Sequence, residues 1–562
     1  MQLKLSTAHI LQSILATAFV LGTFASSAQD DKLTKQVQVV RPYEPTISDA
    51  FKLNQMPRVQ DTLKIVPKFT YTLASRPMIP GLRVDPITPA RMVAEPQSKL
   101  RMGYVRLGIG TYTSPLAELY VNQLRSNNNV FGGWLKHKSS FGKIKLDNGV
   151  KSDADYSRTA INLFGKRIFS NSLLWGDLEY NNKGFTYYGY DTSSPTADLN
   201  NQDSKQKFNQ LDAALGYHST HTDSTHYNYA VSSNFRYFAD NFSMQQNTIG
   251  INISADKFFK AERVGLDLSI KHIAKNEKLD SINNTIIKFS PWIGLFGEQW
   301  RVKAGVQYLY DANSYQKNTF FYPIAHLSYD IISHYLIPYV EMSGRLEENS
   351  YDKILNENPW VVPGIDVFNT NHKMNLVGGV KGNFSSNVSY NAFASYSIVD
   401  SMYFYVNTSI DPTNPLFNRF DVETDNVTQT RFVGELTIAA SSSLSFFLKG
   451  QYQSFKMKEL EKPWHKPELE GQLSVKYNLR DKILVNFDII AEGKRFAKTA
   501  DIANPITELN GLVDVNIGLQ YNYNRRLGAF LDINNIAASK YSHYYLYPMQ
   551  RFNIMAGVSY AF

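Results

Sequence analysis

Apolar and polar residues alternate along most of the chain after Leu116. In the clearest example, residues 513–524 (VDVNIGLQYNYN), every second position is apolar. A two-residue period places successive side chains on opposite faces, so it predicts strands that are apolar on one face only. Another such pair, residues 473–479 and 483–489, is separated only by Arg480, Asp481 and Lys482, which predicts a tight hairpin.

The final segment, Arg551 to Phe562, carries the same pattern to the end of the chain. A last strand with an apolar outer face is what closes a bacterial outer-membrane β-barrel. We therefore predict a barrel that contacts outer-membrane lipid and the barrel assembly machinery. The predicted closing signal consists of Phe552, Ile554, Val558, Tyr560 and Phe562.

The breaks between the segments alternate in length, as expected for short periplasmic turns and longer extracellular loops. The long breaks are 191–206, 276–285, 348–371, 409–427, 457–467, 495–510 and 538–550. The short ones are 170–172, 222–225, 260–262, 333–335, 385–387, 441–443, 480–482 and 524–526. Weaker breaks are expected near 125–129, 141–143, 152–156, 240–244, 296–300 and 314–318.

These breaks divide residues 116–562 into 22 segments, the first running outward at Leu116 to Leu124. An all-β transmembrane antiparallel barrel of about 22 strands is therefore the predicted fold. Residues 103–111 (GYVRLGIGT) also resemble a strand. Including them would make the number odd, whereas a barrel with both chain ends in the periplasm needs an even number. We therefore predict that they lie outside the wall.

Composition excludes several classes of protein. The chain has 562 residues with 35 Tyr, 34 Phe and no Cys, and its mean hydropathy is −0.31. Without cysteine there are no disulfides or Cys-ligated metals. The net charge is +8, but no dense basic run indicates nucleic acid. We expect no cofactor and no enzymatic activity, because no Ser/His/Asp spacing stands out and Gly-rich phosphate loops are missing.

The first residues predict export. Residues 1–28 read as a signal peptide, with Lys4, an apolar core and small residues before the cleavage site. Residues 29–115 contain nine prolines between Pro42 and Pro96, which disfavours central strands and long helices. We expect this Pro-rich segment in the periplasm or inside the lumen, and the outer-membrane barrel over residues 116–562.

The C-terminal region carries Asn534-Asn535-Ile536, Lys540-Tyr541, Tyr547-Pro548 and an aromatic final strand. In this arrangement it resembles the end of a TonB-dependent receptor barrel. The resemblance implies a 22-strand barrel in the outer membrane. The family's plug domain, with its glycine-rich pattern and Ile-Arg-Gly type motif, has no counterpart in residues 29–115. The opening KQVQVVRPYEPTISDAFKLNQ is similar to plug-less receptor-like proteins of Bacteroidota.

Residues Val37, Gln38, Val39 and Val40 could form a TonB box. Such a box binds TonB by adding a strand to the partner, so backbone hydrogen bonds supply the affinity. The alternative is an ordinary short periplasmic strand, which could equally meet another periplasmic partner. Both interpretations remain open.

Three other features could carry function. His218, His221 and His226, with Asp223, could bind a metal, although a solvated turn is favoured and no metal is assigned. The aromatic clusters 185–190 and 541–547 could bind sugar, but the aromatic girdle at the outer membrane interface is favoured. The loop 348–371, with Trp360, could constrict the pore, contact a surface partner, or only connect two strands.

The sequence thus predicts a receptor-like or porin-like barrel for solute passage or uptake across the outer membrane. The alternative is a structural or assembly subunit of an outer-membrane complex, without transport. In that case the Pro-rich segment would dock on a partner, as its weakly self-packing composition allows.

Overall fold

The computed structural model describes residues 100–146, 149–189, 205–221, 224–279, 283–313, 315–365, 367–407, 419–499 and 505–562. The predicted signal peptide, Val37–Val40 and the Pro-rich segment up to residue 99 lie outside these residues. No helix among the described residues is long and apolar enough to cross a membrane.

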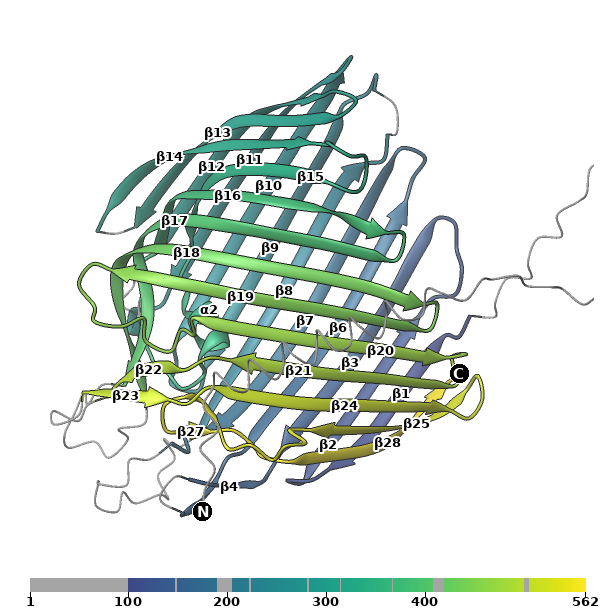
Figure 1. Ribbon diagram of the computed structural model, residues 1–562, viewed down its shortest axis with the longest axis vertical. Helices are drawn as coiled ribbons and strands as arrows, with labels where there is room; N and C mark the ends of the chain where they lie inside the picture. Colours follow the sequence, from purple (N-terminus) through teal and green to yellow (C-terminus); the bar gives the residue numbers. More distant parts are fainter. Residues whose placement is uncertain are drawn as a thin grey trace, which may run out of the picture. The chain divides into compact units, whose positions relative to one another are not determined.

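The described chain forms a closed antiparallel β-barrel of 22 strands (Figure 1). The wall strands are β1 (Gly103–Gly110), β2 (Ser114–Asn122), β3 (Asn129–Ser140), β6 (Tyr156–Ile168), β7 (Ser172–Thr186), β8 (Lys205–Ser219), β9 (Asn228–Asp240), β10 (Gln245–Phe259), β11 (Glu262–Lys275), β12 (Asn284–Phe296), β13 (Trp300–Asn313), β14 (Lys317–Tyr329), β15 (Ile337–Glu347), β16 (Thr370–Ser385), β17 (Val388–Asn407), β18 (Phe420–Ser441), β19 (Leu444–Met457), β20 (Leu469–Leu479), β21 (Ile483–Glu492), β24 (Leu512–Asn522), β25 (Leu527–Asn534) and β28 (Asn553–Ala561). The predicted fold class and strand number are therefore confirmed.

Short elements outside the wall belong to the connections. They are the hairpins β4 (Lys143–Lys145) with β5 (Lys151–Asp153), β22 (Arg495–Lys498) with β23 (Ile506–Leu509), and β26 (Ser542–Tyr544) with β27 (Tyr547–Pro548), the helix α2 (Tyr351–Glu357) and the 3₁₀ turn η2 (Glu277–Leu279). All lie in connections at one end of the barrel, which we call the loop end. The opposite end, where β28 finishes beside the turn before β25, is the turn end.

The final strand closes the barrel by pairing with both β25 and β1. Gly103 and Phe562 exchange backbone hydrogen bonds of 3.1 and 2.9 Å at this closure. Val558, Tyr560 and Phe562 are exposed on the outer face, whereas Met555 and Ser559 of the inner face are buried. The strand has the geometry expected of a closing strand, and its role as an assembly signal remains a prediction.

The placement of residues 103–111 outside the wall is wrong. They form the wall strand β1. Its Leu107 and Ile109 are exposed on the outer face, like the outward apolar residues of the other wall strands. The segment counted between breaks 141–143 and 152–156 is instead the small β4–β5 hairpin, because Ile144 and Leu146 are buried in the apolar core at the loop end. The two errors cancel in the count, and β2 runs in the opposite direction to that predicted.

Several predicted short breaks are tight hairpins, as between β10 and β11, whereas the connections from β8 to β9 and from β14 to β15 are longer. Between β20 and β21, Arg480 and Asp481 have φ angles of +54° and +55°, the left-handed pair of a type I′ turn. The Asn478 side chain accepts a hydrogen bond from the Asp481 amide at 2.8 Å. A two-residue turn of this type explains why so few residues separate the two apolar runs.

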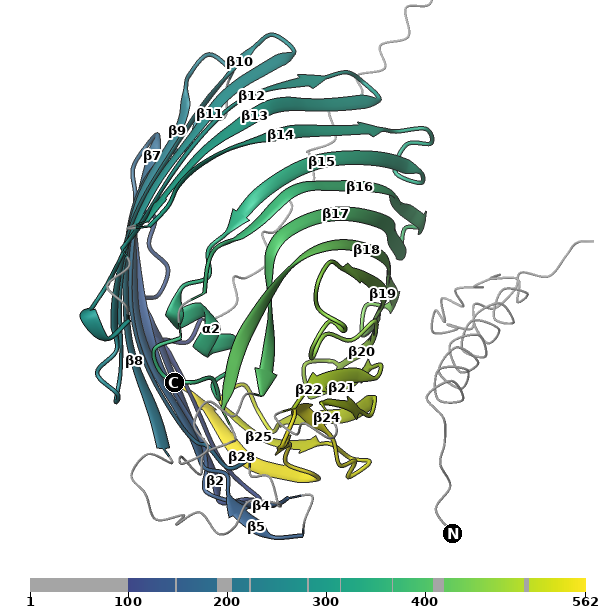
Figure 2. The ribbon, with the colours of Figure 1, turned by 90° about the vertical axis from the view of Figure 1, so that its left-hand side faces the viewer.

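The backbone pairing between β14 and β15 is incomplete. β14 and β15 pair only from Ala325–Met342 to Ser328–Tyr339, although both strands continue toward the loop end. Beyond that point β15 keeps its pairing with β16 and turns into the barrel (Figure 2). The upper half of β15 is therefore held by backbone hydrogen bonds on one side only, and it leads directly into α2.

A small apolar core fills the space where β14 and β15 separate, which we call the step. The ring of Tyr322 from β14 packs with Ile286, Leu309 and Leu346, and its hydroxyl donates to Asn371 at 2.7 Å. A Cβ on Gly344 would lie 2.4 Å from the Tyr322 ring, so only glycine permits this close approach.

Candidate functional site

The helix α2 is the centre of an inward-folded loop at the loop end. Tyr351, Ile354 and Leu355 occupy one face at helical spacing and are buried, and Asp352 lies in the first turn. A seven-residue helix is too short to be stable alone. Its stability must come from the surfaces that pack against it.

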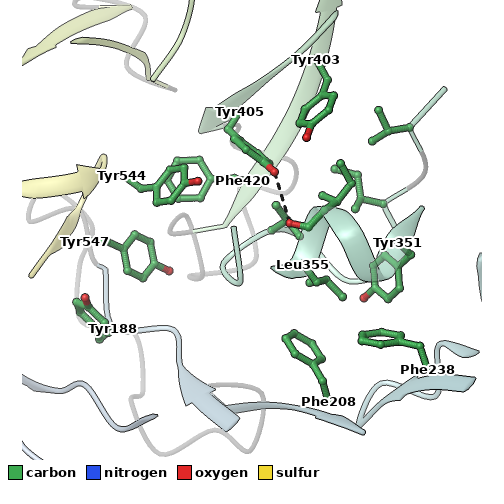
Figure 3. Close-up of a cluster of buried hydrophobic side chains, with 14 of the residues drawn as sticks. Tyr188, Phe208, Phe238, Tyr351, Leu355, Tyr403, Tyr405, Phe420, Tyr544 and Tyr547 are labelled. Atoms are coloured by element: carbon green, nitrogen blue, oxygen red, sulfur yellow. Dashed lines mark hydrogen bonds between the residues drawn. The ribbon is translucent and has the colours of Figure 1, made fainter. Parts of the chain in front are cut away.

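Those surfaces form one aromatic-rich core, part of which is drawn in Figure 3. We use the name cap for this core together with the loops that supply its side chains. Trp360 stacks on Tyr547 with ring centroids 4.1 Å apart, and Tyr547 contacts Tyr188 at 5.0 Å. On the other side of α2, Tyr351 meets Phe238 edge-on at 5.8 Å. Aromatic pairs at these distances add stabilisation to the burial of their apolar area.

The cap crosses the lumen. Its members include Phe208 on β8 and Phe420 on β18, and β8 and β18 lie on opposite sides of the closed sheet. A continuous set of packed side chains that joins two opposite walls must span the mouth between them. The 348–371 loop therefore folds inward, which was one of the three interpretations left open by its sequence.

Polar contacts hold α2 to the wall. Asp352, almost fully buried, accepts hydrogen bonds from Arg236 of β9 at 2.8 Å and from Gln246 of β10 at 2.7 Å. Arg236 also bonds Asp212 of β8 at 2.5 Å. Arg236 thus supplies the ionic partner that buried Asp352 requires, while Arg236 itself stays 42% exposed.

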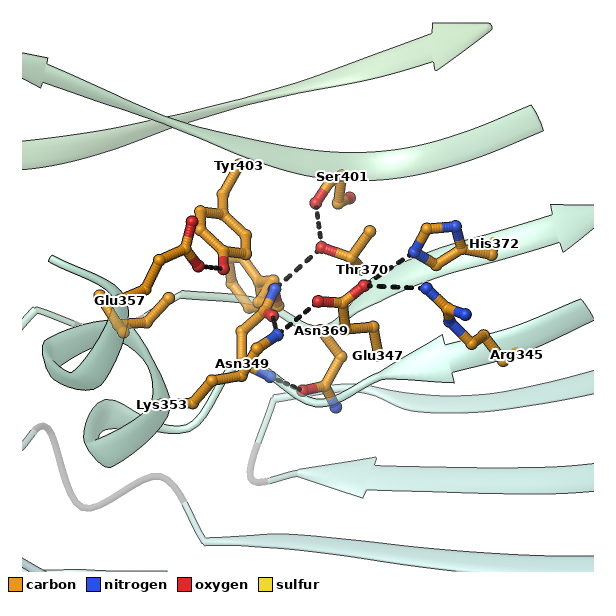
Figure 4. A network of polar contacts seen from close by, with 12 residues as sticks. Arg345, Glu347, Asn349, Lys353, Glu357, Asn369, Thr370, His372, Ser401 and Tyr403 are labelled. Carbon is orange, nitrogen blue, oxygen red and sulfur yellow. Dashed lines mark hydrogen bonds and ion pairs between the residues drawn. The ribbon is translucent and has the colours of Figure 1, made fainter. Parts of the chain in front are cut away.

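A second polar group ties α2 to β15 and β16 (Figure 4). Glu347 accepts from Lys353 at 2.6 Å and contacts the His372 ring at 2.9 Å. At the C-terminal end of α2, Glu357 bonds the Tyr403 hydroxyl and pairs with Lys466 at 3.2 Å. The helix is thus fixed to both sides of the lumen.

The C-terminal loop is locked into the cap by Arg495. This fully buried side chain donates to the carbonyl oxygens of Ser542 and His543, each at 3.0 Å, and pairs with Glu492 at 3.2 Å. Two carbonyl acceptors and one ion pair thereby offset part of the cost of burying a guanidinium ion.

His465 is a neutral part of the same core. Its Nδ1–H donates to the Tyr405 carbonyl at 3.0 Å, and its Nε2 accepts from the Tyr545 amide at 3.3 Å. Burial lowers the pKa of His465 to about 3. His543 is 47% exposed, and partial desolvation followed by nearby Arg495 lowers its pKa to about 4. Both rings are therefore uncharged at neutral pH.

The aromatic-girdle interpretation of the two tyrosine clusters is wrong. Tyr187, Tyr188, Tyr544 and Tyr547 are buried in the cap and do not face lipid. Tyr187 and Tyr547, whose rings have no exposed surface, offer no ring face to a sugar. The reason is that the loops carrying these residues turn inward, where apolar rings gain more contacts than at the rim.

The histidine cluster gives no metal site in the part of the chain that the structure describes. His221 and His226 stack with centroids 4.4 Å apart, and His218 lies on β8. No group of three or more His, Cys, Asp or Glu residues with suitable geometry is found among the described residues. Asp223 lies outside them.

Sequence comparison finds no matching family model and no matching curated protein. Solved structures do match. The siderophore receptor PirA from Acinetobacter baumannii has a TM-score of 0.63 at 11% identity, over 83% of this chain and 81% of that one. The ferric-catecholate import receptor Fiu from E. coli gives 0.61 at 9% identity, over 83% and 82%.

The pyoverdine outer-membrane receptor FpvA from Pseudomonas aeruginosa gives a TM-score of 0.60 at 12% identity, over 83% of this chain and 79% of that one. At such low identity the likeness concerns the fold. The fold is that of the TonB-dependent outer-membrane receptor barrels, as the C-terminal sequence predicted.

Proposed function

We propose that this chain is an outer-membrane transport barrel whose outer mouth is closed by the cap, and that solute passes when the cap moves. The observation that carries this proposal is the continuous aromatic core joining opposite walls of the barrel. Structurally similar barrels include siderophore and ferric-catecholate receptors, which favours solute uptake as the task of the pathway. The proposal assigns no enzymatic activity.

The step between β14 and β15 indicates how the cap moves. The upper half of β15 lacks a hydrogen-bonded neighbour on the β14 side, and it carries α2 at its end. Breaking the contacts of Tyr322 with Leu346 and Gly344 would let the upper half of β15 move together with the β16 residues to which it stays paired. The cap then opens as a lid hinged at the register shift between Ser343 and Arg345.

The N-terminal segment extends the proposal. We propose that the Pro-rich segment before the barrel lies in the periplasm or in the lumen. Within it, Val37–Val40 is the strand that binds TonB or another periplasmic partner. Backbone pairing of this kind would let a pull on the segment reach the barrel.

Single-channel conductance in planar bilayers tests the closure. Three variants are compared with the full chain: one with residues 351–364 replaced by a short Gly-Ser linker, one lacking residues 29–98, and one with both changes. We expect the double variant to conduct far more than the variant lacking residues 29–98 alone. Equal conductance of these two variants would overturn closure by the cap, and only the absence of conductance in both would favour the non-transporting structural subunit.

The hinge is tested separately by cross-linking, since the native chain contains no cysteine. A Tyr322→Cys/Gly344→Cys pair locks the step, whereas Leu327→Cys/Val340→Cys joins two residues that are already paired. We expect oxidation to suppress channel openings only in the first variant, and reduction to restore them. Openings that persist in the oxidised first variant would exclude this hinge.

A further inference from the structure

A cavity of about 350 Å³ lies between the cap and the inner wall. Trp360 and Glu357 line it from the α2 loop, Tyr541 and Tyr544 from the C-terminal loop, and Glu492 and Asp514 from β21 and β24. Its surface is mostly apolar, with a few acidic groups. This combination and size are typical of small-molecule binding sites.

The charges around the cavity do not balance. Glu357 has Lys466 at 3.2 Å and Glu492 has Arg495 at 3.2 Å. Asp514 accepts a hydrogen bond from the Tyr541 hydroxyl at 2.8 Å, and no described Lys, Arg or His lies within ion-pair distance of it. One carboxylate of the three is therefore uncompensated by any described residue.

The hydrogen bonding of Asp514 is also incomplete. Its Oδ1 is shielded from solvent and has no hydrogen-bond partner within the described residues. A carboxylate that has one hydrogen-bond donor and no cationic neighbour is poorly compensated, and a cation in the adjacent cavity would balance its charge. His543, which also lines the cavity, is neutral and cannot serve as that cation.

We propose that this cavity binds an organic cation, with an ammonium or guanidinium head at Asp514 and an apolar body against Trp360 and Tyr544. Aromatic rings attract such cations through their negative faces, most strongly where water is excluded. The apolar lining favours an organic cation over a hydrated metal ion, and no metal-binding group is found among the described residues.

The site also depends on the closed cap. Trp360 and Glu357 belong to the loop that crosses the mouth, whereas Asp514 belongs to the wall. Moving the loop would separate the aromatic wall from the carboxylate, so a bound cation favours the closed arrangement. Binding can be measured without transport, so its failure would leave the conductance proposal untouched.

Isothermal titration of the purified full chain in detergent tests the proposal. The probe is choline, and its control is 3,3-dimethyl-1-butanol, the uncharged molecule of the same shape. We expect choline to bind at least about tenfold more tightly than the alcohol. Equal binding of the two molecules, or no choline binding up to about 10 mM, would overturn the proposal.

Asp514→Asn provides the matched variant, because the amide oxygen can still accept from Tyr541. We expect it to weaken choline binding about tenfold or more while an unchanged melting temperature shows that the barrel is intact. Asp488→Asn is the control, since Asp488 lies on the inner face of β21, bonds Ser474 and does not line the cavity. Equal affinities of the two variants would show that Asp514 is not the cation's partner.

Discussion

The two ends of the barrel use the same aromatic side chains in opposite ways. At the turn end, Phe384, Tyr523 and Phe562 are 67%, 63% and 48% exposed on the outside. At the loop end, Tyr187, Phe420 and Tyr547 are completely buried in the cap. Aromatic content alone therefore does not distinguish a lipid-facing belt from an internal core, because the path of the connecting loop decides which one forms.

The connections explain the difference. Tight hairpins at the turn end leave no chain to fold over the lumen, so their aromatic residues face outward. The longer connections at the loop end reach across the mouth and meet one another. The turn end is therefore built by local pairing, and the loop end by contacts between distant segments.

The largest expected effect is on cap stability, and it appears when one aromatic side chain is removed from each end of the barrel in turn. Tyr547→Ala should destabilise the cap by about 3–5 kcal/mol, because it removes a buried ring that packs on Trp360 and Tyr188. Phe384→Ala should change cap stability by less than about 0.5 kcal/mol. Hydrogen exchange of the amides of residues 541–547 measures both, and equal protection in the two variants would contradict the contrast.

Substitution of Arg495 tests whether polar contacts stabilise the cap as much as aromatic packing does. Arg495→Met should cost about 3 kcal/mol of cap stability, since it leaves Glu492 without its partner in a partly buried site. Adding Glu492→Gln should recover part of the loss by removing the unpaired charge. The same exchange measurement applies, and a single variant as stable as the native cap would refute the role of the ion pair.

Acid should loosen the cap but not the turn end. The pKa of His465 is about 3 when folded, below its ordinary value near 6.5. The opened state therefore binds the proton first, and cap stability falls by about 1.4 kcal/mol per pH unit between those values as pH drops.

His465→Gln is the control for this pH dependence. Its amide can donate to the Tyr405 carbonyl and accept from the Tyr545 amide, as the neutral ring does. Protection of the cap should then vary less steeply with pH. A slope equal to that of the native protein would assign the pH response to other groups.

The smallest effect is expected from Asp352→Asn. The amide keeps the size of the side chain and can still accept from Gln246, and Arg236 retains Asp212 as its ionic partner. The loss should be about 1 kcal/mol of cap stability. A loss as large as that of Tyr547→Ala would mean that the ionic contacts, and not the aromatic core, hold the cap closed.

The strand pattern was readable from sequence because it depends on neighbouring residues only. Residues 513–524 alternate by the geometry of a pleated strand, and Arg480 and Asp481 mark a hairpin by their position between two such runs. The sequence pattern assigned the β4–β5 segment to the wall and left residues 103–111 outside it, whereas the structure has the reverse. This error shows the limit of reasoning from local patterns. Both segments have short apolar alternation, and only the surroundings decide which one joins the wall.

The candidate site was only partly accessible. The loop with Trp360 stood out by its length and composition, and residues 351–355 show helical spacing of apolar side chains. Nothing near Arg495, His465 or Asp514 in the sequence announces their partners. Apart from Glu492, which lies three residues before Arg495, those partners come from other connections or other strands, so no local pattern records the pairing.

The sequence by itself determined the barrel class, the outward apolar face and the alternation of turns and loops, because each follows from local periodicity and turn chemistry. Only the tertiary structure decided that the mouth is capped and which side chains meet there. The Tyr188 hydroxyl, for example, donates to the carbonyl of Pro548 at 3.0 Å, across most of the chain. Such contacts arise from barrel closure, which brings remote loops to one rim and lets their apolar side chains bury one another.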